Sequence, residues 1–141
     1  MPKKGKIKAR HFPTGKIRPS EIRDDKRVMF CFRYLDLRHE KFTVTNCESG
    51  YFCKVLERFK NYSTMQVGEI LSSRSKALRA HSINWQDTTE PTGFDLPSHL
   101  EGVEGYQLNV TQNYGRIHGF FIENFFFVVW LDPRHALCPM R

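Results

Sequence analysis

The sequence predicts an α+β fold, an antiparallel sheet that ends in a three-stranded meander and carries a helix pair on one face. Residues 125–131 are a run of seven apolar side chains, the length of a buried strand and too short to cross a membrane. Residues 106–112 alternate apolar and polar side chains, as a half-buried strand does. Residues 50–62 repeat apolar side chains three and four positions apart, which indicates an amphipathic helix.

A basic arm at residues 1–27 precedes a single domain at 28–141. The arm contains ten Lys or Arg against three Asp or Glu, whereas the counts in the domain are equal, so the arm carries the whole net charge of +7. Such an arm typically binds phosphate backbones without sequence preference, and otherwise serves as a solubilising tail. The nucleic-acid contacts expected from it are Lys3, Lys4, Lys6, Lys8, Arg10, Lys16 and Arg18.

Two short strands are expected between the arm and the first helix. Residues 28–35 have the apolar and aromatic composition of a strand, residues 36–40 that of a turn, and residues 41–45 alternate as a return strand.

The helix pair follows at residue 50. The apolar face of the first helix, 50–62, consists of Phe52, Val55, Leu56 and Phe59. Ser63 is a favourable N-cap for a second helix, and Gln66 three residues later completes a capping box. With a tight turn between them, the two helices would form an αα-hairpin.

A long loop at residues 84–105 leads into the meander. It contains five Pro and Gly residues, and we expect Trp85 and Phe94 to fix parts of it to the body. Strands at 106–112, 115–122 and 125–131 then follow one another closely enough to pair as successive hairpins.

The hairpin register decides which polar side chains meet. Two-residue turns at 113–114 and 123–124 would pair Asn109 with His118, and His118 with Val129. The face away from the helices then carries Asn109, Thr111, Arg116, His118, Val129 and Leu131. The opposite face carries Leu108, Val110, Ile117, Phe121, Val128 and Trp130, an apolar layer for the helices to cover. A slip of one residue would break this arrangement.

The candidate site consists of Arg116, His118, Asp132 and His135. A turn at Asp132-Pro133 would bring His135 back over the polar face. Two imidazoles and a guanidinium without a nucleophilic Ser or Cys motif suit metal-independent cleavage of RNA. One imidazole removes the 2′-hydroxyl proton, the other protonates the leaving oxygen, and Arg116 stabilises the charged phosphate. Asn109 and Thr111 would contact the nucleic acid beside it.

The cysteines and the start of the chain bear on cofactors and compartment. Cys31, Cys47, Cys53 and Cys138 have no zinc-type spacing, so we expect free thiols buried as small apolar side chains, with no cofactor and no metal. No apolar signal-peptide segment follows the basic start, which favours the cytoplasm and no membrane contact.

From residue 50 to residue 135, the order of elements resembles the RelE/ParE-type toxin fold, in which a helix pair is followed by an antiparallel meander. The resemblance implies a small basic ribonuclease acting on messenger RNA at the ribosome, or a gyrase poison, neutralised by an acidic antitoxin. Arg116 and His118 would correspond to its catalytic strand residues and His135 to its C-terminal one. The extra N-terminal strands and arm depart from that pattern. The segments GRIHGF and VVWLDPRH also resemble the signature of an uncharacterised prokaryotic family.

Three functions remain open on sequence alone. The first is the ribonuclease. The second is a non-enzymatic module, in which the arm contacts nucleic acid while Arg116 and His118 anchor a protein partner. The third is a metal-dependent nuclease using His118, Asp132 and His135, which no HxH or HxxxH spacing supports.

Overall fold

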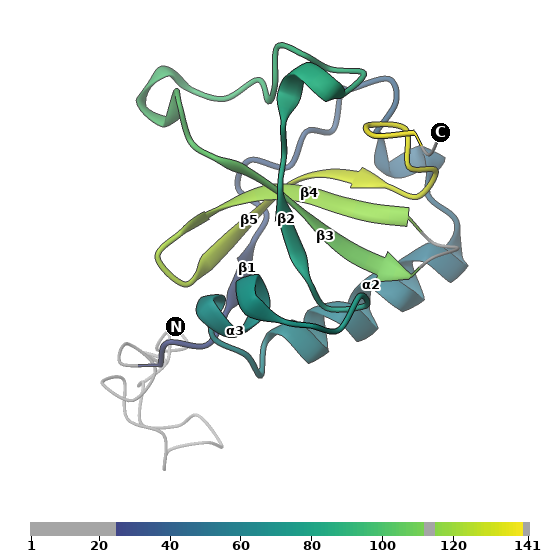
Figure 1. Cartoon of the computed structure of the whole chain (residues 1–141). Helices are drawn as coiled ribbons and strands as arrows, with labels where there is room; N and C mark the ends of the chain where they lie inside the picture. Colours follow the sequence, from purple (N-terminus) through teal and green to yellow (C-terminus); the bar gives the residue numbers. More distant parts are fainter. Residues whose placement is uncertain (1–24, 112–114, 140–141) are drawn as a thin grey trace, which may run out of the picture.

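The computed structural model describes residues 25–111 and 115–139 (Figure 1). In chain order its elements are β1 (Met29–Cys31), η2 (Val44–Asn46), α2 (Ser49–Tyr62), α3 (Val67–Ser72), β2 (Ala80–Ser82), η3 (Trp85–Asp87), η4 (Ser98–Leu100), β3 (Gly105–Thr111), β4 (Gly115–Ile122) and β5 (Phe125–Asp132). The predicted α+β class and the C-terminal meander are confirmed. Within the described ranges, no helix is both long enough and apolar enough to span a bilayer.

The sheet has five strands in the order β1-β5-β4-β3-β2. The meander forms its centre, and β2 adds antiparallel to the outer edge of β3. β1 pairs with β5 in parallel, and the two strands are separated in the chain by both helices and the other three strands. The sheet is therefore mixed, with a single parallel pair at one edge.

The return strand predicted at 41–45 does not form, and β1 is shorter than the expected 28–35. Instead, the segment after β1 turns at Asp36, whose carboxylate accepts the backbone N–H groups of Arg38 and His39 and the indole N–H of Trp130. Phe42 is then buried against Trp130, with ring centroids 4.7 Å apart. The alternation in this segment reflects a loop that covers the sheet, not a strand within it.

Helix α2 lies where the sequence predicted it, but its buried side chains are Tyr51, Val55 and Tyr62, while Leu56 is exposed. The capping box is displaced by three residues. Ser63 ends α2, with its hydroxyl donating back to the carbonyl of Phe59. Gln66 is the N-cap of α3, and its backbone N–H donates to Glu69 Oε1 at 3.4 Å.

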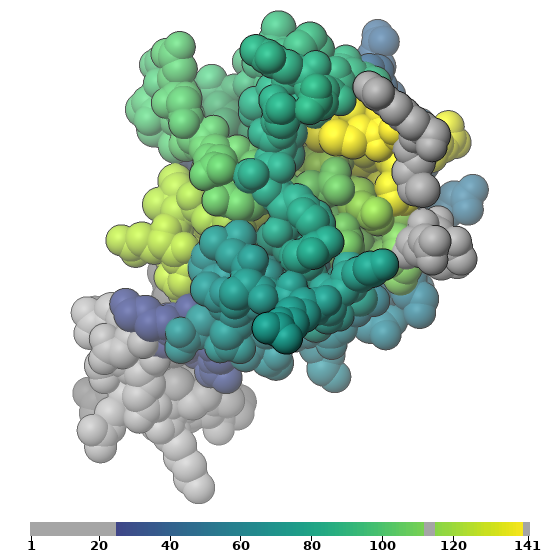
Figure 2. Space-filling view, viewed as in Figure 1, coloured from purple at the N-terminus to yellow at the C-terminus, as the bar shows by residue number. Residues whose placement is uncertain are grey.

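Both faces of the sheet are covered, each by its own apolar cluster. Helices α2 and α3 cover one face, over a cluster that includes Tyr51, Ile70, Leu108 and Ile117. The segments around residues 34–44, 83–103 and 133–138 cover the other, over Phe42, Leu100, Phe120, Val129, Trp130 and Leu137. Figure 1 shows the helices below the strands and the loops above them. In the space-filling view, residues of the long loop lie above the helical segment and are continuous with it through the strands (Figure 2). As expected, Trp85 and Phe94 fix the long loop, packing edge to face on each other and on Trp130.

Two irregularities shift the register from the predicted one. Between β3 and β4 the pairing slips after Asn109, so Asn109 faces Arg116 and Gln107 faces His118. Between β4 and β5 an extra residue, Val129, lies opposite the step from His118 to Gly119, and His118 faces Trp130. Trp130 therefore belongs to the face of His118, and Leu131 to the helical face, the reverse of the prediction.

Gly119 is required at the second irregularity. A Cβ there would overlap the carbonyl oxygen of Phe127 and lie 2.8 Å from the ring of Phe126. We expect Gly119→Ala to lower the free energy of unfolding by about 1–3 kcal/mol, as overpacking of a core does. Gly68→Ala in α3 is the control, because an added Cβ there would meet no atom within 4 Å apart from its chain neighbours and the helix backbone. It should leave stability unchanged or raise it by up to about 1 kcal/mol. Urea denaturation of both variants measures this, and an equal loss in both would contradict it.

Candidate functional site

The centre of the loop-covered face is a hydrogen bond between His118 and Asp132. His118 Nε2 lies 2.9 Å from Asp132 Oδ2, and the side chains are 0% and 1% exposed. The same carboxylate accepts the backbone N–H groups of Ala136 at 2.7 Å and Leu137 at 3.0 Å. An ionised carboxylate only accepts, so Nε2 carries the imidazole proton and Nδ1 has a lone pair. That Nδ1 is buried and has no hydrogen-bond partner among the described residues.

The environment keeps the imidazole neutral and the carboxylate charged. Burial lowers the pKa of His118, although the Asp132 carboxylate acts to raise it; Arg116 and His135 lower it further. Burial acts to raise the pKa of Asp132, but its hydrogen bonds from His118 and from the 136–137 backbone outweigh this and hold the pKa below its usual value. The pair is therefore a carboxylate that orients a neutral imidazole.

The turn expected after Asp132 forms and closes over the pair. Thr89 holds it from the other side, because its backbone N–H donates to the carbonyl of Leu137 at 2.9 Å and its hydroxyl to that of Ala136 at 2.7 Å. His135, half-buried, lies within this turn with a positive φ of 55°. His118 and Asp132 thus meet as the sequence suggested, but beneath a packed cover instead of on an open face.

Arg116 and Asn109 belong to a second feature, which we call the basic pocket. This cavity of about 540 Å³ lies where β3 and β4 extend beyond the end of the short β2. Its lining residues are Arg58, Lys76, Ala77, Arg79, His81, Gln107, Asn109, Thr111 and Arg116. Four of them are cationic and none is acidic, so the pocket is complementary to an anion.

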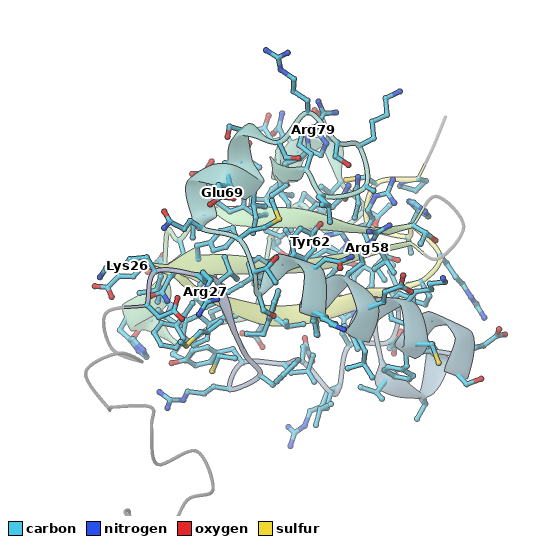
Figure 3. The ribbon with its side chains drawn as sticks, turned by 90° about the horizontal axis from the view of Figure 1, so that it is seen from below. Lys26, Arg27, Arg58, Tyr62, Glu69 and Arg79 are labelled. Carbon is cyan, nitrogen blue, oxygen red and sulfur yellow. The ribbon has the colours of Figure 1, made fainter. Side chains whose placement is uncertain are left out.

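Hydrogen bonds to the protein fix the guanidinium groups of the pocket. Arg58 Nε donates to the carbonyl of Val110 at 2.5 Å, and Arg116 Nη1 donates to those of Gly115 at 2.9 Å and Thr111 at 3.3 Å. Figure 3 shows Arg58 and Tyr62 on the side of α2 that faces the strands. Because these arginines are held before a ligand arrives, little side-chain entropy is lost on binding.

His81 is the imidazole that lines the basic pocket. Its Nε2 accepts a hydrogen bond from Arg79 Nε at 3.2 Å, so Nδ1 carries the proton of the neutral ring. Partial burial, together with the charges of Arg79 and Arg116, lowers the pKa of His81. An exposed, neutral imidazole therefore lies beside two guanidinium groups.

The sequence pattern brings Arg116, Asn109 and Thr111 together but does not reveal the rest of the pocket. Arg58 lies outside the apolar face that periodicity predicts for α2, and the sequence pattern predicts no function for the basic residues between α3 and β2. The clustering of basic side chains in that stretch could have indicated the pocket, because Arg74, Lys76, Arg79 and His81 fall within eight residues. The predicted arm contacts, from Lys3 to Arg18, lie outside the described residues.

In the part of the chain that the structure describes, there is neither a metal site nor a disulfide. Within 25–111 and 115–139, no three His, Cys, Asp or Glu side chains are arranged to hold a metal ion. The four cysteines are free, as expected, but the prediction that they are buried is wrong. Cys31 and Cys47 are half-buried, and Cys53 and Cys138 are exposed.

Comparisons of the chain with protein-family models, curated proteins and solved structures find no match.

The buried pair makes stability depend on pH. Since the pKa of His118 is lowered in the folded state, the unfolded state binds the extra proton below the ordinary value of 6.5, and stability falls as the pH falls. The slope is up to about 1.4 kcal/mol per pH unit. The pKa of Asp132 is also lowered in the folded state, so stability decreases further when the pH falls below the ordinary aspartate pKa of 3.8. We expect His118→Gln, which keeps a donor for Asp132, to reduce the slope between pH 6.5 and 5.

Urea denaturation at pH 7.5, 6.5 and 5.5 measures this slope. His99→Gln, at an exposed position, is the matched control and should retain the wild-type slope. An unchanged slope in His118→Gln would show that this imidazole does not bind a proton on unfolding.

Proposed function

We propose that the protein binds single-stranded RNA and that the basic pocket holds its phosphate. The observation that carries this proposal is the pocket itself, in which four cationic side chains converge with no carboxylate in the lining. Guanidinium groups donate to phosphate oxygens in a fixed geometry and keep their charge, which suits them to this task.

The shape of the pocket favours a single strand over a duplex. A volume of about 540 Å³ is that of a site for a small ligand, and a double helix presents no isolated group that would enter it. In single-stranded RNA the nucleotides can be splayed out and bound individually. The amides of Gln107 and Asn109 in the lining supply polar contacts beside the phosphate.

Arg116→Gln should weaken RNA binding and reduce its salt dependence, because one fewer counterion is released. For a single strand, the slope of log K against log salt should fall by about 0.7 for each phosphate that the protein no longer neutralises. Lys60→Gln is the control, since Lys60 is exposed on α2 and does not line the pocket. Fluorescence anisotropy with a labelled RNA, at salt concentrations between about 50 and 200 mM, measures both quantities. Equal effects in the two variants would refute the proposal.

A second candidate function is metal-independent cleavage of the bound RNA. It is favoured by one observation, a neutral imidazole, His81, beside Arg79 and Arg116 in the pocket. His118, two residues from Arg116 on β4, is oriented by Asp132 as a catalytic base would be, but has no exposed surface. Its participation requires the turn at 133–138 to move. The resemblance to RelE/ParE-type toxins belongs to this candidate, with the ribosome and an acidic antitoxin as its partners.

Incubation of the protein with labelled RNA in EDTA distinguishes the two candidates. If the protein is a ribonuclease of this kind, cleavage survives chelation. It then falls in His118→Gln or His81→Gln by about 10²–10⁴-fold, the usual contribution of one acid–base group. His99→Gln is the control. Binding without cleavage supports RNA binding as the only function of the two. Cleavage that EDTA abolishes indicates a metal-dependent nuclease.

A further inference from the structure

We infer that the basic pocket takes the phosphorylated end of an RNA strand, that is, a terminal phosphomonoester, and not a phosphodiester within the strand. This inference rests on the proposed function, and it names the group that the pocket recognises. It follows from the number of charges in the pocket and from the directions from which they come.

The charge of the pocket exceeds what an internal phosphate can neutralise. Arg58, Lys76, Arg79 and Arg116 surround one cavity of about 540 Å³, and no acidic side chain lines it. A phosphodiester carries one negative charge, whereas a phosphomonoester carries about −1.5 to −2 at pH 7. Cations that repel one another at short range are stabilised most by the ligand that concentrates the most negative charge among them.

The cations also approach from different sides. Arg58 extends from α2 and is held on the carbonyl of Val110 in β3. Arg79 enters from the segment before β2, and Arg116 from β4, each fixed by its own hydrogen bond. A phosphomonoester offers three terminal oxygen atoms to donors around it, whereas a diester offers two and requires a path for the chain on both sides. A cavity ringed by donors therefore suits the end of a strand.

The neutral imidazole adds a donor of a second kind. His81 accepts from Arg79 through Nε2, which leaves its Nδ1–H to donate. The amides of Gln107 and Asn109 lie in the same lining and offer polar groups for the rest of a terminal nucleotide. The pocket thus has the composition of a site for one nucleotide with its phosphate, and not of an extended groove.

The test compares RNAs of one sequence that differ only at their ends. Single-stranded oligonucleotides with a 5′-phosphate, with a 3′-phosphate or with hydroxyls at both ends, labelled internally, are titrated with the full-length protein by fluorescence anisotropy. We expect one phosphorylated end to bind about tenfold to a hundredfold more tightly than the hydroxyl ends, the effect of one or two additional charge-assisted hydrogen bonds. The oligonucleotide that binds more tightly identifies which end of the strand is recognised.

Variants link the effect to the pocket. Arg79→Gln and Lys76→Gln should each remove most of the preference for the phosphorylated end, whereas Lys60→Gln should retain it. Thermal denaturation verifies that the variants are folded, and the two pocket variants provide independent tests if one is unstable. Adenosine 5′-monophosphate should compete for the site where a 5′-end is recognised, and adenosine should not.

The outcomes separate this inference from the function on which it rests. If all three RNAs bind equally and the pocket variants weaken them equally, the pocket binds internal phosphates, so the inference is wrong and the proposed function stands. If none of the RNAs binds, both are wrong. A preference that survives in Arg79→Gln and Lys76→Gln places end recognition elsewhere and also overturns the inference.

Discussion

The hydrogen bond between His118 and Asp132 is the interaction on which the loop-covered face depends. It joins adjacent strands, β4 and β5, at a point where neither side chain reaches water. The carboxylate also accepts two backbone N–H groups of the following turn, which brings Leu137 into the apolar cluster. A buried carboxylate is tolerated only when it is satisfied in this way. The turn therefore satisfies the buried carboxylate, and the carboxylate holds the turn against the apolar cluster.

The basic pocket follows from a different constraint, the unpaired edge of β3. β2 pairs with β3 only as far as Leu108, so the carbonyls beyond it have no strand partner on that side. Side chains of α2 supply the missing donors, Tyr62 to Asn109 and Arg58 to Val110. Burial raises the pKa of Tyr62 to about 12, so its hydroxyl remains a donor. The arginine that completes this edge also presents its charge to the cavity, so one side chain serves both the fold and the site.

The sequence predicted the elements that local pattern determines. The meander and α2 have strong periodicity, and both form within a residue or two of the expected bounds. The pairing register of β3, β4 and β5 was not predictable, because it depends on two irregularities, at Asn109 and at Val129, that no turn motif in the sequence indicates. The burial of His118 was missed for a related reason. Its cover includes Phe42 and the turn at 133–138, segments distant from His118 in sequence whose joint packing has no local signature. The pocket draws its four cations from three segments, α2, the stretch between α3 and β2, and β4, and periodicity relates none of these segments to the others.

The place where the basic arm joins the domain bears on the length of ligand that could reach both the arm and the pocket. Asn124, in the turn between β4 and β5, donates to the carbonyls of Asp25 and Arg27 and anchors the chain there. The pocket lies at the other end of β4, eight residues away, or about 25 Å at the rise of an extended strand. A lone nucleotide is too small to bridge that span, whereas an RNA strand bound in the pocket would be held at two points if the arm contacts phosphate as the sequence predicts. The affinity for such a strand would then depend on its length more steeply than the affinity of either contact alone.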